Sequence, residues 1–161
     1  SFKYYLSSNK EIKIDNLELD DNIKKTVVDQ FEKFIPFVYG EIANRRNADG
    51  LKTYIGNEYL NDVNREYSST YNSINSNSRY RITGISLNNF ETEVDRTYVY
   101  EGKFYVELKM SFRYKVNSSY TSIFGRNRTT SNTSRAVVYG TYVKENEQWK
   151  IADLDLKKLY T

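Results

Sequence analysis

The sequence predicts an α+β fold, a curved antiparallel sheet of four to six strands packed around a long kinked helix and a second helix. Two patterns carry this prediction. From Phe104 to Val116 apolar residues alternate with polar ones, which gives one strand an apolar and a charged face over about twice the usual strand length. Before residue 80, apolar residues recur instead at steps of three and four, the period of amphipathic helices.

The first predicted helix begins at Asp20 or Asp21, whose side chains suit an N-cap, and continues to Ile42. Pro36 lies inside it. Because proline lacks the amide donor and clashes with the preceding turn, we expect a kink or a break near Phe34 to Pro36.

A second helix is predicted over residues 59–74, where six apolar residues keep helical spacing: Tyr59, Leu60, Val63, Tyr67, Tyr71 and Ile74. Residues 1–19 are interpreted as a lead-in with one weak strand, Glu11–Asp15. Residues 20–161 are interpreted as a single domain, because a chain of 161 residues would be crowded as two.

The second half of the chain predicts strands over 80–87, 97–100, 104–116, 135–143 and 148–156. Glu101-Gly102 is a turn or bulge signal, and residues 117–134 are polar enough to predict a long arm or mobile loop. In the last strand the apolar parity shifts from Trp149 and Ile151 to Ala152 and Leu154. Such a shift indicates a β-bulge, and bulges bend sheets.

Composition excludes several kinds of chemistry. The sequence has no cysteine and no histidine, so zinc sites, thiol nucleophiles and histidine-based triads are excluded within it, and we expect no cofactor and no metal. The net charge is +3, from 24 basic and 21 acidic residues, with the two signs interspersed along the chain. This is not the footprint of a nucleic-acid-binding protein.

The hairpin Val143–Leu154, in which a polar turn precedes Trp149 and Ile151, resembles the nuclear transport factor 2-like superfamily over roughly residues 20–160. Within it, the chain looks most like the extracytoplasmic domains of Gram-positive membrane-anchored envelope proteins of the teicoplanin-resistance-associated membrane protein family. That resemblance implies a bacterial cell-surface domain, anchored through a segment upstream of Ser1, that binds a protein partner or a cell-wall component. It is also similar to scaffold domains of conjugation and type IV secretion systems.

The superfamily resemblance implies a cone whose mouth can hold a ligand. The candidate pocket residues are the inward row of the long strand and one neighbour: Phe104, Val106, Leu108, Met110, Phe112 and Trp149. None of them can exchange a proton in catalysis, and superfamily isomerases need a buried aspartate. We therefore expect a non-catalytic interaction domain. The alternatives are a small-molecule binder or isomerase-type enzyme that uses the cone, and a secretion scaffold.

Two further surfaces are candidates for contacts. In the arm, Phe124, Arg126 and Arg128 combine an aromatic ring with two positive charges, which suits a protein or an anionic wall polymer; a solvated hairpin tip is the plainer interpretation. On the outer face of the sheet, Tyr105 and Tyr139 are candidate anchors for a partner or for a homodimer. We expect no nucleic acid among the partners.

Overall fold

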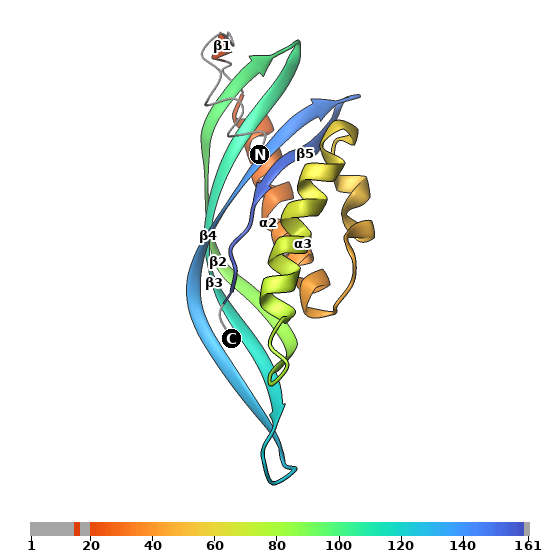
Figure 1. Ribbon diagram of the computed structural model, residues 1–161. Coiled ribbons are helices and arrows are strands. Elements are labelled where there is room, and N and C mark those ends of the chain that lie inside the picture. Colours follow the sequence, from red (N-terminus) through yellow and green to blue (C-terminus); the bar gives the residue numbers. More distant parts are fainter. Residues whose placement is uncertain (1–14, 17–19, 160–161) are drawn as a thin grey trace.

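The computed structural model describes residues 15–16 and 20–159 and shows an α+β fold with a curved antiparallel sheet, as predicted (Figure 1). Five strands lie in the sheet in chain order, β1-β2-β3-β4-β5. The sheet curves around helices α2 and α3, which lie on its concave side (Figure 1). The predicted strand Glu11–Asp15 falls outside the described residues except for Asp15, which pairs with Val99 as part of the two-residue strand β1 (Asp15–Asn16).

Helix α2 (Asp21–Ala43) begins at the predicted cap, because the Asp20 carboxylate accepts a hydrogen bond of 2.9 Å from the Ile23 amide. The helix runs through Pro36 without ending, so the predicted break does not occur. A proline inside a helix costs about 3 kcal/mol. The buried residues on either side of it, Ile35 and Val38, both fully inaccessible to solvent, hold the two halves against the same core.

Two short 3₁₀ helices, η1 (Ala48–Tyr54) and η2 (Asn57–Tyr59), connect α2 to α3 (Leu60–Asn75). The connection is tied to the last strand: the Gly56 amide donates to the Ile151 carbonyl at 2.8 Å, and the Lys150 ammonium donates to the Thr53 carbonyl. The second helix therefore exists where the sequence predicts it, with η2 as its first turn. None of the described helices is long and apolar enough to cross a membrane.

Three long strands form the body of the sheet: β2 (Arg81–Tyr100), β3 (Lys103–Thr121) and β4 (Asn127–Glu145). The shorter β5 (Gln148–Asp155) completes it. The predicted bulge is confirmed, because the register between β4 and β5 shifts between Thr141 and Tyr142 and leaves Ala152 without an opposite residue. The β2–β3 turn at Glu101-Gly102 and the β4–β5 turn at Asn146-Glu147 both have positive φ at their two central residues.

Residues 117–134, predicted as a long arm or a mobile loop, form an arm: they continue β3 and β4 in regular pairing and are closed by a short turn at residues 122–126. The strands stay paired residue by residue as far as Thr121 and Asn127. In Figure 1 this hairpin extends past the helices at the lower end of the molecule. Residues 127–135 of β4 are exposed on both faces, whereas on β3 the buried face continues through Ser118, whose hydroxyl group lies 2.8 Å from that of Thr130. A polar composition is compatible with strand pairing because serine, threonine and asparagine still form the backbone ladder.

The core lies between α2 and the sheet. Phe31 of α2 packs edge-to-face on Tyr142 of β4, with ring centroids 6.1 Å apart. It also lies directly over Gly140, where an added Cβ would stand only 2.5 Å from the Phe31 ring. Tyr39 packs beside Phe112 of β3 with a centroid distance of 6.1 Å. The helix therefore fills the concave side of the sheet along much of its length.

Candidate interaction surface

The inward row predicted for β3 is largely core. Val106, Leu108, Met110 and Phe112 are each at most 2% exposed. Phe104, predicted to belong to the same row, is 40% exposed, because it lies close to the β2–β3 turn at the end of the sheet. Side chains of α2 pack against this region of the sheet: the Tyr39 ring lies 6.1 Å from that of Phe112, and the Phe31 ring 6.1 Å from that of Tyr142 on the neighbouring strand.

A small cavity of about 250 Å³ remains between α2, η1 and the β4–β5 hairpin. It contains Trp149 of the predicted pocket, together with Gln30, Lys33, Phe34, Phe37, Tyr54 and Tyr142. The Tyr54 ring lies 5.4 Å from that of Phe34 and 5.5 Å from that of Phe37, so aromatic faces form most of the wall. No carboxylate lines this cavity, which suits an apolar group better than proton-transfer chemistry.

The strand aspartates lie elsewhere. Asp95 and Asp155 are exposed, whereas Asp153 is 5% exposed and lines a hollow between β5 and α3. Glu66 of α3 faces the same hollow, and burial together with the nearby Asp155 charge raises the pKa of its carboxyl group. These acidic groups belong to the packing of α3 on β5, away from the aromatic cavity.

Tyr105, predicted to be an exposed anchor on the outer face, is only 2% exposed. Its hydroxyl group shares a 2.6 Å hydrogen bond with that of Tyr59, and its ring stacks on Tyr98 at 5.2 Å. Burial raises the pKa of all three phenols. The sequence pattern of β3 could not show this burial, because the covering residue Tyr59 comes from η2, on a different part of the chain.

Ion pairs surround Tyr105 at this end of the sheet. Glu107 is 8% exposed and accepts from the Arg96 guanidinium at 3.0 Å. The Lys103 ammonium lies 3.1 Å from Glu58 of η2 and 3.9 Å from Glu145 of β4. This end of the sheet is therefore covered by η2 and its charges are paired.

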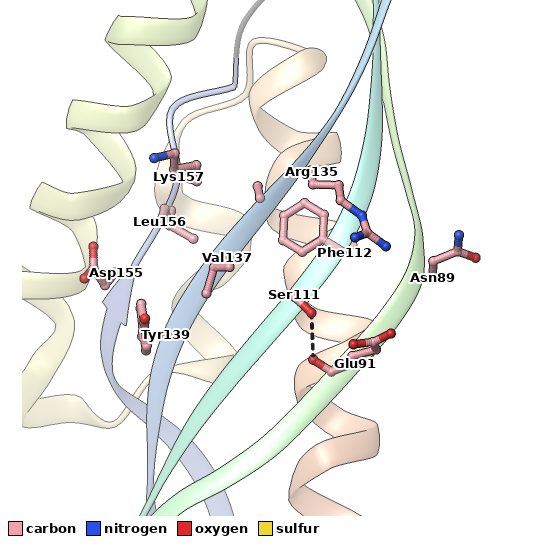
Figure 2. Close-up of a pocket in the computed structure, with 11 residues that line it drawn as sticks. Asn89, Glu91, Ser111, Phe112, Arg135, Val137, Tyr139, Asp155, Leu156 and Lys157 are labelled. Carbon is pink, nitrogen blue, oxygen red and sulfur yellow. Dashed lines mark hydrogen bonds between the residues drawn. The ribbon is translucent and has the colours of Figure 1, made fainter.

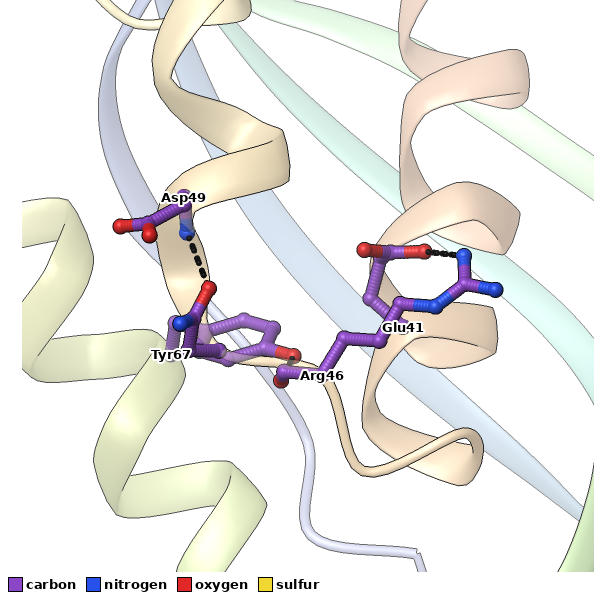
Figure 3. A network of polar contacts seen from close by, with 5 residues as sticks. Glu41, Arg46, Asp49 and Tyr67 are labelled. Carbon is purple, nitrogen blue, oxygen red and sulfur yellow. Dashed lines mark hydrogen bonds and ion pairs between the residues drawn. The ribbon is translucent and has the colours of Figure 1, made fainter.

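The end of α2 is held by a second polar network (Figure 3). The Glu41 carboxylate binds the Arg46 guanidinium at 2.9 Å, and the Tyr67 hydroxyl group donates to the Arg46 carbonyl. Burial raises the pKa of Tyr67 to about 12. Each of these groups has its partner within the network, which fixes the connection from α2 to η1.

Charge is distributed very unevenly over the molecule. The segment Leu108–Lys144, here called the basic hairpin, has seven basic residues and no acidic residue, whereas the rest of the chain has 17 basic and 21 acidic residues. The expectation that the two signs are interspersed is therefore wrong for this segment. Among the described residues, Lys144 is the only one of the seven that forms an ion pair. Arg113 and Arg135 lie directly opposite each other on β3 and β4, although like charges in that arrangement repel.

The tip of the basic hairpin exposes the arm residues named from the sequence. Phe124 is 84% exposed and its neighbour Ile123 is 87% exposed. The turn that carries them is well hydrogen-bonded: the Ser122 amide donates to the Arg126 carbonyl at 2.7 Å, and Gly125 adopts a φ of 76°. Arg126 and Arg128 are exposed and line the same hollow as Phe124. The structure thus brings the three predicted arm residues together at one end of the molecule.

A larger cavity, of about 600 Å³, lies where β5 ends beside β4 (Figure 2). Its wall includes Arg135, Val137 and Tyr139 of β4, and Asp155, Leu156 and Lys157 of the segment that leaves the sheet. Ser111 and Glu91 extend it across β3 and β2. Tyr139, predicted from the sequence as a sheet-face contact, therefore borders this cavity, whereas Tyr105 is buried at the covered end of the sheet.

Comparison with known proteins adds little. No family model matches the sequence, and no curated protein matches it. Among solved structures, the chain is similar to the intermembrane space region of the chloroplast protein ARC6, with a TM-score of 0.37 and 13% sequence identity. That likeness covers 86% of this chain and 97% of the other. At this TM-score it assigns neither a fold family nor a function.

Proposed function

We propose that this chain is a non-catalytic extracytoplasmic interaction domain of a membrane-anchored bacterial envelope protein. In this proposal it has a nuclear transport factor 2-like fold and binds a protein partner or a cell-wall component. One observation carries the interaction role: the basic hairpin concentrates seven positive charges, six of them without an ion pair among the described residues, on an element that extends past the helices. Charge held unpaired on a projecting element is available to attract an anionic partner.

The nuclear transport factor 2-like assignment is supported by the order of elements. After the two-residue strand β1 the helices come first, and a meander of long strands then curves around α2 and ends in the hairpin that contains Trp149 and Ile151. Those are the features on which the sequence resemblance rests.

Association of two copies through the basic hairpin is disfavoured by its uniform charge, because two such surfaces would repel each other. The burial of Tyr105 also removes one of the two anchors considered for a homodimer. A different, more acidic partner is therefore the better fit to the hairpin.

The location can be tested by cysteine labelling in the parent protein, because this chain has no cysteine of its own. Ser73 is an exposed residue of α3, outside the basic hairpin. We expect Ser73→Cys to react in intact cells with a membrane-impermeant maleimide, as a control cysteine in a known surface protein does. Labelling only after the cells are permeabilised would refute the extracytoplasmic location.

A second candidate function is favoured by the aromatic cavity around Trp149, which is large enough for a small apolar ligand. Binding there would change the emission of Trp149, the one tryptophan of the chain. Titration with small apolar and aromatic compounds, followed by Trp149 emission and repeated on the Tyr54→Ala variant, distinguishes a small-molecule binder from an interaction domain. A saturable change that Tyr54→Ala abolishes would favour the small-molecule function over the interaction domain.

A further inference from the structure

The strand β4 has an open edge. On one side β4 pairs with β3 from Val143, opposite Tyr105, to Asn127, opposite Thr121. On the other side β5 pairs with it only as far as Tyr139–Asp155. On that second side, Asn127–Val138 therefore have no strand beside them in the described part of the chain, and the backbone groups that face this side form an open edge about 40 Å long.

The segment that follows β5 leaves this edge free. After Asp155 the chain is tied to α2: the Tyr39 hydroxyl group accepts from the Lys157 amide at 2.9 Å and donates to the Lys157 carbonyl at 2.6 Å. Leu156 and Leu159 are buried. The 600 Å³ cavity opens at the point of departure, between this segment and the β4 residues Arg135 and Val137 (Figure 2).

The side chains along the open edge indicate which kind of strand fits. Val137 is 37% exposed, so the position opposite it favours an apolar side chain. Two residues further along the same face, Arg135 lies opposite Arg113 with no ion pair between either and a described residue. A carboxylate placed at that position would relieve the repulsion between the two guanidinium groups.

The same charges discourage other occupants. An open edge invites pairing with a second copy, and natural proteins prevent this by placing charged residues on the edge. Two β4 edges brought together would add the positive charges of Arg128 and Arg135 from each copy to a hairpin that has no acidic residue. The charges on the edge therefore disfavour pairing with the β4 edge of a second copy and favour pairing with an acidic strand.

We infer that the open edge of β4, Asn127–Val138, binds an extended acidic segment of a partner protein by strand addition, continuing the line of β5. The backbone ladder supplies the affinity, and the position of Arg135 beside Val137 selects a carboxylate next to an apolar side chain. This inference rests on the proposed function, since it names the class of partner that the interaction domain would bind.

The test uses a twelve-residue peptide in which glutamate alternates with valine or threonine, and a control peptide with lysine in place of glutamate. We expect the glutamate peptide to bind and the lysine peptide not to bind. Amide hydrogen exchange should slow at every second residue of Asn127–Val138, because successive residues of a strand direct their backbone groups to opposite sides. Arg113→Gln combined with Arg135→Gln should weaken binding about tenfold, since each removes one exposed charge interaction.

The matched control is Lys25→Gln with Arg65→Gln, which removes two exposed charges from α2 and α3 and should leave binding unchanged. Three results would overturn the inference: no binding of the glutamate peptide up to about 1 mM, equal binding of both peptides, or binding without slowed exchange along the edge. The last result would indicate a general attraction of polyanions. Labelling of Ser73→Cys judges the proposed location separately, so failure of one proposal is distinguishable from failure of the other.

Discussion

Gly140→Ala is expected to destabilise the fold, because the added methyl group has no room. Gly140 pairs with Leu108 on one side and Leu154 on the other, and its Cα lies under the ring of Phe31. The new Cβ would stand 2.5 Å and 2.8 Å from two ring carbons, whereas carbon atoms in contact are separated by about 3.5 Å or more. Phe31 has no exposed surface, so its ring must move by about 1 Å against a packed core.

Overpacking of this kind destabilises a protein by about 1–3 kcal/mol. Replacing a strand glycine by alanine offsets part of this, because the unfolded chain loses conformational freedom, which stabilises the fold by about 0.5–1 kcal/mol. We therefore expect Gly140→Ala to lower the free energy of unfolding by about 1–2 kcal/mol, measured by urea denaturation followed by circular dichroism. The matched control is Gly84→Ala in β2, where the nearest side-chain atom, Nδ2 of Asn117, lies 3.8 Å from the new Cβ, so no loss is expected. Combining Gly140→Ala with Phe31→Leu should cost less than the sum of the two changes. Equal stability of the Gly140→Ala and Gly84→Ala variants would refute the packing described for α2 on β4.

Three further predictions concern single groups. Glu147→Gly should raise the free energy of unfolding by up to about 1 kcal/mol, because Glu147 adopts a φ of 64°, a strained region for any residue with a Cβ. Thermal denaturation measures the effect, and a lower melting temperature for the variant would contradict the prediction. Tyr59→Phe should cost about 1–2 kcal/mol, because it leaves the buried Tyr105 hydroxyl group without the 2.6 Å partner, whereas the same change at exposed Tyr54 should cost less. The raised pKa of Glu66 means that the folded state binds its proton more tightly, so this group lowers stability as pH rises above its unfolded value of about 4.3. Glu66→Gln should therefore stabilise the protein at pH 7 and lose that advantage near pH 3, and urea denaturation at the two pH values measures the difference.

Much of the fold could be predicted because burial imposes a period on the sequence. The helix that contains Phe31 and Val38 and the bulge at Ala152 both follow from the spacing of apolar residues. The outer ends of β3 and β4 could not be predicted in this way, because β4 is exposed on both faces over residues 127–135 and the buried position of β3 beyond Val116 is the polar Ser118, so no apolar alternation marks them. Their strand conformation follows instead from continuous pairing with each other.

The candidate site was predictable only in part, for two different reasons. The burial of Tyr105 depends on Tyr59, 46 residues away in the sequence, and no local pattern of β3 records that contact. The charge of the basic hairpin, in contrast, is visible in the sequence as the absence of any acidic residue between Glu107 and Glu145. The overall net charge of +3 conceals it, because the excess of acidic residues elsewhere offsets it.

The most direct test of the basic hairpin as the interaction surface is photocrosslinking in intact cells that express the protein, with a photoreactive residue in place of Val137. We expect one discrete crosslinked product, lost when Arg113→Gln and Arg135→Gln are combined and retained when Lys25→Gln and Arg65→Gln are combined. A photoreactive residue in place of Lys25 should give no such product. If the product from Val137 survives removal of the two hairpin arginines, or if Lys25 yields the same product, the basic hairpin does not direct the interaction.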